Sequence, residues 1–336
     1  MKIAYIISNE CVISGDSNGI KIQAVTWANG LKSKGHQVDL IDTWAHNNWS
    51  KYDLIHIFGN GLWLHTFVER LHNKNHNIVF SPIIDSEKSK KLYKLASYIA
   101  IPKLRLYSTN FIIRELKPFI KGYFVRSEYE RRFVTECYDI PLNNTFLVPL
   151  SGRFAVNNRI FKTERRDNFC LHISSIYQPR KNVVRLIEAA KRYNFKLVLA
   201  GNKGSIEEFK PLKNAIGKSS NIEVLGYISD EEMINLYKTA KVFALPSISE
   251  GVGLVGIDAA ALGCDVVLTN IGAPKEYYND MAYLVNPFSI DSIGQAVTNA
   301  LVSTQQPELS KHIIANYSLN TTIDKLINAY QSLIIF

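Results

Sequence analysis

Short apolar runs alternate with longer amphipathic stretches along the 336 residues of the chain. Runs of this length, bounded by polar residues, glycine or proline, are typical of buried strands. In the first half of the chain they lie at residues 3–7, 38–41, 53–58, 77–80, 123–125 and 146–148. Residues 20–34 are expected to form a helix that ends at Gly35. The alternation predicts a parallel sheet with helices on both faces, which is a doubly wound α/β domain.

The same pattern begins again after a polar stretch. Residues 153–168 are polar, charged and weakly periodic, as expected of a linker. Strands are expected beyond it at 170–174, 197–200, 222–225, 242–245 and 266–268, and helices at 183–193, 288–301 and 317–336. The length of 336 residues and the 46% hydrophobic content are ample for two cores. We therefore predict domains at 1–152 and 169–315, joined by a linker at 153–168 and followed by a C-terminal helix in 316–336.

The candidate chemistry concentrates in residues 242–276, VFALPSISEGVGLVGIDAAALGCDVVLTNIGAPKE. An apolar run ends at Pro246, a polar turn and a glycine cluster follow, and a helix through Ala259 ends at Gly263. Glycines where a strand gives way to a helix let backbone N–H groups approach a ligand, and the helix N-terminus favours an anion. Two carboxylates, Glu250 and Asp258, bracket the glycines.

These glycines have two other interpretations, a dinucleotide-binding loop and tight packing of the backbone. GVGLVG also spells G-x-G-x-x-G, the fingerprint of a dinucleotide-binding loop. That loop needs its first glycine almost directly after the strand and an acidic residue at the end of the next strand. Here residues 246–250 intervene, and the next strand ends in Thr269 and Asn270, which disfavours a dehydrogenase. Glycines that merely permit tight packing remain an alternative.

The segment resembles the nucleotide-sugar site of the family 4 retaining glycosyltransferases, whose pattern runs P-S-x-x-E-G-F-G-L-P-x-x-E-A-M-A-x-G-x-P-V-V and then G-G-x-P-E. The residues in register are Pro246, Ser247, Glu250, Gly251, Gly253, Leu254, Ala259, Gly263, Val266, Val267, Gly272, Pro274 and Glu276. The departures are Val252 for the aromatic residue, Gly256 just after the position of the usual proline, Asp258 for the second glutamate and Asp265 for the second proline. The resemblance implies the GT-B architecture: two Rossmann-like doubly wound domains that face each other across a cleft, with a C-terminal helix that crosses back to the first domain.

The resemblance also implies roles for residues of the second domain. Relatives carry an arginine and a lysine that hold the donor diphosphate; Lys181 matches the lysine, Ser175 falls where the arginine usually is, and Arg180 supplies a neighbouring charge. Ordinary surface charge at a helix start is the alternative. Glu250 would orient hydroxyls of the donor sugar, and Asp258 the ribose. The residues expected to be catalytic are Glu250, Lys181 and Arg180, and those expected to bind the donor are Gly251, Val252, Gly253, Leu254, Asp258, Gly226, Tyr227, Ile228, Ser175 and Gly201.

The acceptor side is expected in the first domain. The loop S-G-D-S-N-G, with Gly15, Asn18 and Gly19, corresponds to a glycine-bearing loop that lies near acceptor and phosphate in the family, although a plain connector is an equal alternative. Many relatives place a histidine or aspartate after the strand at 77–80; this chain offers Asp85 there. His56 ends another strand, and we interpret it as a hydrogen-bonded structural histidine.

Cysteine and histidine spacing indicates neither a disulfide framework nor a metal centre. His72 and His76 have metal-compatible spacing but no third ligand, so we expect them to face solvent. No D-x-D occurs in the chain. We therefore expect no metal and no cofactor besides the nucleoside diphosphate sugar used as substrate. The cysteines are Cys11, Cys137, Cys170 and Cys264, without C-x-x-C spacing.

The charge of the chain is concentrated in one segment. Residues 88–132 hold twelve Lys or Arg against three Glu, a balance of +9, which equals the net charge of the whole chain. Such a segment suits an anionic membrane surface, nucleic acid or plain solvent. No nucleic-acid module is recognisable, which disfavours that partner. The first apolar run is too short for a signal peptide, and we expect a cytoplasmic protein that either docks on the inner face of the cytoplasmic membrane or presents this segment to water.

These observations favour transfer of a sugar from a nucleoside diphosphate donor to a carbohydrate or lipid-linked acceptor. The resemblance implies retention of anomeric configuration and a role in surface polysaccharide assembly. Two alternatives stay open: a GT-B nucleotide-sugar epimerase or hydrolase, and a non-catalytic relative that binds sugar nucleotides.

Overall fold

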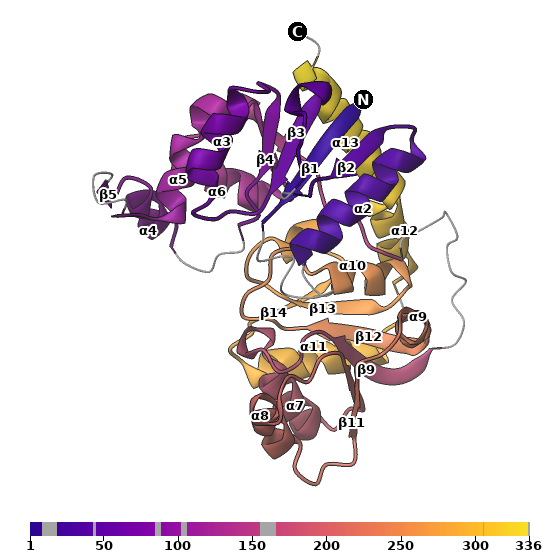
Figure 1. Ribbon diagram of the computed structural model, residues 1–336. Coiled ribbons are helices and arrows are strands. Elements are labelled where there is room, and N and C mark those ends of the chain that lie inside the picture. The colour runs from indigo at the N-terminus through magenta and orange to yellow at the C-terminus, as the bar shows by residue number, and fades with distance from the viewer. Residues whose placement is uncertain are drawn as a thin grey trace. The chain divides into compact units, whose positions relative to one another are not determined.

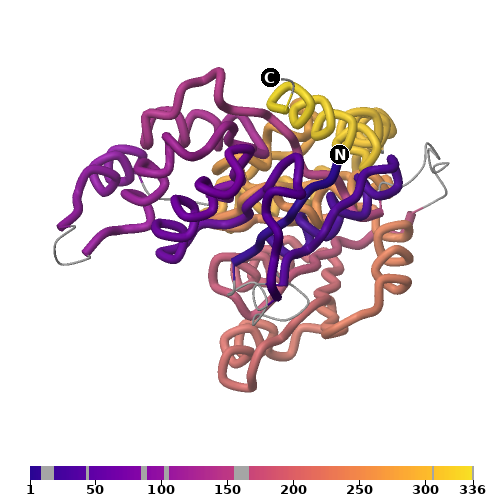
Figure 2. The backbone as a smooth tube through the Cα atoms, turned by 45° about the horizontal axis from the view of Figure 1, so that its top comes forward, coloured from indigo at the N-terminus to yellow at the C-terminus, as the bar shows by residue number. Residues whose placement is uncertain are grey.

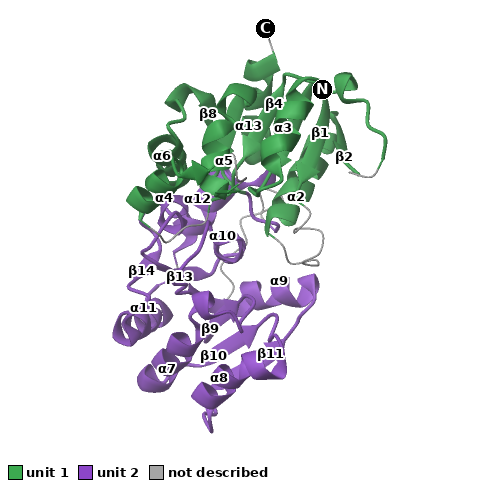
Figure 3. Ribbon diagram, turned by 60° about the vertical axis from the view of Figure 1, so that its left-hand side comes forward, with its two compact units in different colours: residues 1–150, 320–336 green, residues 151–319 purple. Residues whose placement is uncertain are grey.

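The chain forms two compact units, Met1–Leu150 with Asn320–Phe336, and Ser151–Leu319 (Figure 3). The structure is a computed structural model, and it describes residues 1–8, 19–42, 45–84, 89–101, 106–154, 166–304 and 306–334. Most of the expected linker, residues 155–165, lies outside the described residues, as do Gly15, Asn18 and Asp85 of the expected acceptor side.

A six-stranded parallel sheet in the order β2-β1-β3-β4-β7-β8 forms the centre of the first unit (Figure 1). Its strands are β1 (Lys2–Ile7), β2 (Gln37–Leu40), β3 (Leu54–Phe58), β4 (Ile78–Ser81), β7 (Gly122–Val125) and β8 (Thr145–Leu147). The helices are α2 (Gly19–Ser33), α3 (Leu64–His72), α4 (Lys90–Ala96), α5 (Thr109–Glu115), α6 (Glu128–Tyr138) and α13 (Leu319–Ile334), and a separate antiparallel pair consists of β5 (Ala100–Ile101) and β6 (Leu106–Tyr107). The strand order reverses at β1, which confirms the predicted doubly wound domain.

The C-terminal helix α13 belongs to the first unit, where Figures 1 and 2 both show it beside β1. The buried hydroxyl of Tyr330 in α13 forms hydrogen bonds with His56 Nδ1 at 2.6 Å and with the Tyr5 hydroxyl at 2.9 Å. His56 Nε2 lies 2.8 Å from Ser81 Oγ. Burial lowers the pKa of His56 well below its usual value, so the ring is neutral. The expected return of the last helix and the structural role of His56 are confirmed.

We expect Tyr330→Phe to lower the free energy of unfolding by about 1–3 kcal/mol, because His56 and Tyr5 then lose a buried hydrogen-bond partner. Urea unfolding of the purified protein measures this change. The matched control is Tyr123→Phe, because the buried Tyr123 hydroxyl has no hydrogen-bond partner among the described residues. Equal stability of the Tyr330→Phe variant and the parent protein would contradict the anchoring role.

The second unit has a second parallel sheet, in the order β11-β10-β9-β12-β13-β14. Its strands are β9 (Asp167–Ile173), β10 (Leu197–Ala200), β11 (Ile222–Gly226), β12 (Ala240–Leu245), β13 (Asp265–Thr269) and β14 (Tyr283–Val285). Its helices are α7 (Val183–Tyr193), α8 (Ile206–Ile216), α9 (Asp230–Thr239), α10 (Leu254–Ala261), α11 (Ile290–Val302) and α12 (Pro307–Tyr317). The order reverses between β9 and β12, and ligands of such sheets bind beyond the carboxyl ends of the strands at that point.

Helix α10 begins earlier than the sequence pattern suggests. It starts at Leu254, so Gly256 lies inside the helix. Gly253 takes a left-handed conformation, with φ +75°, and completes the turn directly before the helix. A Cβ atom on Gly256 would lie 2.6 Å from the Tyr278 hydroxyl, so this glycine is needed for packing.

Candidate functional site

Two loops meet at the reversal point of the second sheet, one after β9 and one after β12. The first contains a short 3₁₀ turn, Pro179–Lys181, and the second contains Glu250. Lys181 Nζ lies 2.5 Å from Glu250 Oε2, and these side chains are only 10% and 12% exposed. Ser247 Oγ donates a hydrogen bond of 3.1 Å to the same carboxylate oxygen. The structure therefore brings together a lysine and a glutamate that lie 69 residues apart in sequence.

Asn182 ties these two loops to each other. Its buried side-chain amide donates to the carbonyl oxygens of Pro246 at 2.9 Å and Pro287 at 2.6 Å. Its backbone is left-handed, with φ +61°, which asparagine tolerates better than most residues. The backbone N–H of Ile248 also donates to the Arg180 carbonyl at 2.8 Å. Sequence reasoning missed Asn182; an asparagine directly before a helix suggests an N-cap, but its side chain makes no cap hydrogen bond to α7.

His172 in β9 lies beneath the same loop and was also missed. It is fully buried, its Nδ1 is 2.8 Å from the carbonyl oxygen of Ala244 in β12, and its Nε2 is 2.7 Å from Ser174 Oγ. Burial, with a smaller contribution from the charge of Lys181, lowers the pKa of His172 to about 4. The ring is thus neutral at pH 7, and it holds the first residue of the lysine-bearing loop without repelling Lys181.

The expected donor residues of β9, β10 and β11 lie at the carboxyl edge of the sheet. A Cβ atom on Gly201 would lie 1.9 Å from the Ser174 carbonyl oxygen, so no other residue fits there. The Gly201 N–H donates to the Gly226 carbonyl at 2.6 Å. Tyr227 follows directly, with 84% of its surface exposed, and leads into Ile228. Ser175 follows Ser174 in the loop after β9. The sheet therefore presents glycine backbone and one exposed aromatic ring along this edge.

The glycine cluster of the β12 loop lies against Glu250. A Cβ atom on Gly253 would lie 3.5 Å from Glu250 Cγ, and a Cβ atom on Gly272, in the loop after β13, would lie 3.4 Å from the Glu250 carbonyl oxygen. Gly251 and Val252 connect Glu250 to this turn, and Leu254 is the first residue of α10. The first N–H groups of a helix have no partner within the helix and attract an anion.

Arg180 does not join the buried pair. Its side chain is exposed and donates to Gln178 Oε1 at 3.1 Å and to the Ser249 carbonyl at 3.5 Å. It therefore remains at the surface of the turn, beside the loop that carries Glu250. Its expected role toward a diphosphate stays a prediction.

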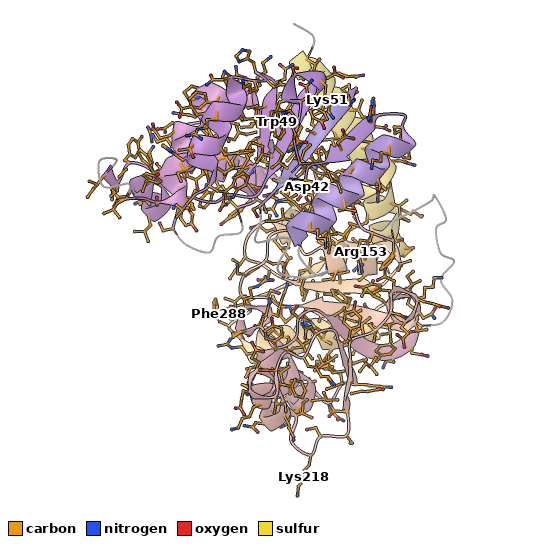
Figure 4. The ribbon with its side chains drawn as sticks, in the orientation of Figure 1. Asp42, Trp49, Lys51, Arg153, Lys218 and Phe288 are labelled. Carbon is orange, nitrogen blue, oxygen red and sulfur yellow. The ribbon has the colours of Figure 1, made fainter. Side chains whose placement is uncertain are left out.

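Asp258 is placed differently from Glu250. Its side chain is buried at 1% exposure, and its Oδ1 accepts a hydrogen bond of 3.0 Å from the backbone N–H of Phe154. Arg153, labelled in Figure 4, has its Nε 3.9 Å from Asp258 Oδ2. Burial raises the pKa of Asp258 to about 6. The observed partner of this carboxylate is thus the backbone at the start of the second unit, and the expected ribose contact stays a prediction.

The raised pKa of Asp258 predicts a pH dependence of stability. The folded-state pKa of about 6 exceeds the unfolded value of about 3.9, so the native state holds this proton more tightly and loses stability as pH rises between these values. We expect the loss from this group to reach roughly 3 kcal/mol above pH 6. Urea unfolding of the parent and Asp258→Asn proteins at several pH values between 4 and 7 measures it. If the free energy of unfolding depended on pH in the same way in both proteins, the raised pKa of Asp258 would be contradicted.

The described residues form no recognisable metal site. Those residues contain no cluster of three His, Cys, Asp or Glu that could hold an ion. His76 is exposed as expected, whereas His72 is only partly exposed and its Nδ1 is buried; His76 Nδ1 lies 3.0 Å from His72 Nε2. The described cysteines, Cys137, Cys170 and Cys264, are free and buried. None of the described helices has the length and apolar character needed to cross a membrane.

Comparisons with known proteins show similarity to glycosyltransferases. Residues 157–318 match the family model "Glycosyl transferases group 1". The O-antigen chain mannosyltransferase B of Escherichia coli is 27% identical over 176 residues, which cover 49% of this chain and 46% of that protein. An uncharacterised glycosyltransferase of Methanocaldococcus jannaschii is 30% identical over 200 residues, which cover 55% of this chain and 54% of that protein. The matches thus span about half the length of these curated relatives.

The fold comparison extends over the whole chain. Sucrose-phosphate synthase from Thermosynechococcus elongatus superposes with a TM-score of 0.73 at 16% identity, covering 99% of both chains. This likeness shows the fold, and with the two observed sheets and the C-terminal helix of the first unit it confirms the expected GT-B fold class. Residues 157–318, in the second unit, match the model of the group 1 glycosyl transferases, which confirms the family resemblance of the motif at 246–276.

Proposed function

We propose that this protein is a retaining glycosyltransferase that moves a sugar from a nucleoside diphosphate donor to a carbohydrate or lipid-linked acceptor. The observation that carries the proposal is the buried pair of Lys181 and Glu250 at the reversal point of the second sheet. A cation and a carboxylate side by side there match two adjacent parts of a sugar nucleotide, the anionic diphosphate and the hydroxyl-bearing sugar.

Lys181 is proposed to bind the donor diphosphate. Breaking the bond between the anomeric carbon and the phosphate oxygen leaves additional negative charge on the diphosphate. A buried ammonium group stabilises that charge more strongly than an exposed one, because the local dielectric constant is low. The N-terminus of α10 adds a partial positive charge, and Arg180 adds a more distant one.

Glu250 is proposed to orient the donor sugar. In the free protein its carboxylate is occupied by Lys181 and Ser247. When the diphosphate becomes the partner of Lys181, the carboxylate is released to accept hydrogen bonds from sugar hydroxyls. These bonds gain strength as the anomeric carbon becomes cationic. The acceptor hydroxyl then attacks from the face that the diphosphate leaves, a phosphate oxygen takes the proton, and the configuration is retained.

We propose that this reaction requires no metal, because Lys181, Arg180 and the helix dipole provide the positive charge toward the diphosphate. We also propose a hexose as the transferred sugar and surface polysaccharide assembly as the process. The support is the similarity to an Escherichia coli protein described as an O-antigen chain mannosyltransferase. The proposed metal independence predicts that sugar transfer proceeds at the same rate in the presence of EDTA.

We further propose that the protein works on the inner face of the cytoplasmic membrane, which residues 88–132 contact. The charge of this segment is partly neutralised within the first unit. Acidic side chains pair with Lys90, Lys94, Arg114, Arg126 and Arg131. Attraction to anionic lipid therefore rests on the remaining basic residues, and the exposed apolar side chains of the same segment gain in importance.

A donor screen tests the proposed function. Thermal shifts with UDP-, GDP- and ADP-hexoses identify a donor, since a ligand that binds only the native state raises stability in proportion to its affinity. NMR of the transfer product then gives its anomeric configuration. Retained configuration in an acceptor-dependent product supports the proposal. Sugar release or epimerisation without acceptor would establish the rival enzyme, and donor binding without any reaction would establish a non-catalytic binder.

A further inference from the structure

Large apolar side chains are exposed together at α4 and the β5–β6 hairpin of the first unit. We name six of them the apolar tip. They are Leu92 (59% exposed), Leu95 (57%), Tyr98 (52%), Ile99 (59%), Ile101 (51%) and Leu106 (58%). Single exposed apolar residues are common on proteins, but a contiguous group marks an interaction surface. Figures 1 and 2 show α4 and the hairpin at the edge of the first unit, away from its six-stranded sheet.

Helix α4 is firmly attached through its other face. The Tyr93 ring meets Phe133 of α6 edge-on, with ring centroids 4.8 Å apart. Ser97 Oγ donates to the Cys137 carbonyl at 2.9 Å, and Lys90 pairs with Glu136 at 3.0 Å. The side chains of Leu92 and Leu95, in contrast, are exposed to solvent. Their exposure is thus a property of the folded unit, because the attached face already fixes the helix.

The remaining members of the tip are also held in place. The Tyr98 hydroxyl donates to Asp139 Oδ2 at 2.6 Å, and the Arg114 guanidinium lies over the Tyr98 ring, 3.4 Å from its centroid. Ile101 of β5 pairs in register with Leu106 of β6, so these two exposed side chains are cross-strand neighbours. The tip is therefore a preformed surface that needs no rearrangement before it binds.

We propose that the apolar tip inserts into the interfacial region of an anionic lipid bilayer. This inference deepens the proposed membrane contact, since it names the side chains that enter the lipid. Lys91 is exposed on α4 among the apolar residues, and lysine is depleted in the cores of protein–protein interfaces. Leucine, isoleucine and tyrosine bordered by lysine are instead the composition of a surface that lies in the headgroup region of an anionic membrane.

The electrostatic and the apolar contributions to this membrane contact differ in their dependence on salt. Attraction between lysine and anionic lipid is screened as the ionic strength rises, whereas burial of apolar side chains in lipid is not. A purely electrostatic contact would therefore be lost at high salt. An inserted tip predicts binding that weakens with salt but does not vanish.

Vesicle flotation with the full chain tests the inference. The first variant is Leu92→Ser with Leu95→Ser and Ile99→Ser, and an independent second variant is Ile101→Ser with Leu106→Ser. The matched control is Leu142→Ser, which alters another exposed leucine of the same unit, 65% exposed. We expect each tip variant to bind phosphatidylglycerol-containing vesicles at least about tenfold more weakly at low and high salt, and the control to bind like the parent protein.

Three outcomes would overturn the inference. They are unchanged vesicle binding by both tip variants, equal loss of binding by Leu142→Ser, and a change from dimer to monomer in the tip variants, which would assign the surface to a second copy of the chain. Thermal shifts with nucleoside diphosphates accompany each variant. An unaltered shift shows that the second unit is intact, so a failure of the membrane inference is distinguishable from a failure of the proposed transferase.

Discussion

Replacing Lys181 with alanine is expected to lower kcat/KM for sugar transfer by about a thousandfold, roughly 4 kcal/mol of transition-state stabilisation. The physical reason is the burial of the Lys181 side chain, which is only 10% exposed, at the point where the departing diphosphate gains charge. The variant should also raise the dissociation constant of the donor, because the diphosphate is already charged in the ground state. Steady-state kinetics and a calorimetric donor titration measure these two effects.

The controls for this variant follow from the ion pair. Removing Lys181 leaves the Glu250 carboxylate without its cation, so the variant is expected to lose stability as well. The double variant Lys181→Ala with Glu250→Gln removes both charges and should recover stability but not activity. Arg180→Ala alters an exposed neighbouring cation and should have a milder effect. Recovery of activity in the double variant would show that Lys181 acts only through folding.

Glu250→Gln is expected to lower turnover by about a hundredfold, roughly 2.7 kcal/mol, with little change in the affinity for nucleoside diphosphate. The amide oxygen can still accept from Ser247 and Lys181, which keeps the loop in place. What is lost is the negative charge that strengthens hydrogen bonds to the sugar in the transition state. Initial-rate assays of product formation and thermal melting curves compare the turnover and the stability of the variant with those of the parent protein.

Two results would contradict this role of Glu250. Full turnover of the Glu250→Gln variant would remove the carboxylate from the mechanism. A parallel fall of activity and melting temperature would instead assign it to the stability of the loop. A selective loss of turnover, with melting temperature and nucleoside diphosphate affinity retained, is the result that the proposed role requires.

The sequence predicted the main elements of the second unit. Helix 183–193 and strand 197–200 were predicted with the boundaries that the structure has, because periodicity and turn residues are local signals. The N-cap of α9 shows the same kind of local signal, because the Ser229 side chain accepts a hydrogen bond from the Glu232 N–H. The family resemblance gave Lys181 and Glu250 separate roles toward the donor, and the ion pair between them was seen only in the structure.

Contacts between distant segments could not be read from the sequence. Asn182 bonds residues 64 and 105 positions away, and Asp258 bonds a backbone group 104 positions away. Glu130 occupies the capping-box position of α6, yet its carboxylate binds Arg126 and the backbone N–H of Ile84 instead. A buried arginine and a distant amide compete for that carboxylate, and neither is visible in a local pattern. Such contacts depend on which distant segments the fold brings together, and a local sequence pattern does not show this.

Calorimetric titration of nucleoside diphosphates tests the central claim most directly, since it needs neither the sugar nor the acceptor. The account predicts that UDP, GDP or ADP binds the parent protein, that Lys181→Ala loses at least about a hundredfold in affinity, roughly 2.7 kcal/mol, and that Glu250→Gln retains it. Equal affinity of the parent and Lys181→Ala proteins for every nucleoside diphosphate, or no binding of any of them by the parent, would contradict a donor site at the reversal point of the second sheet.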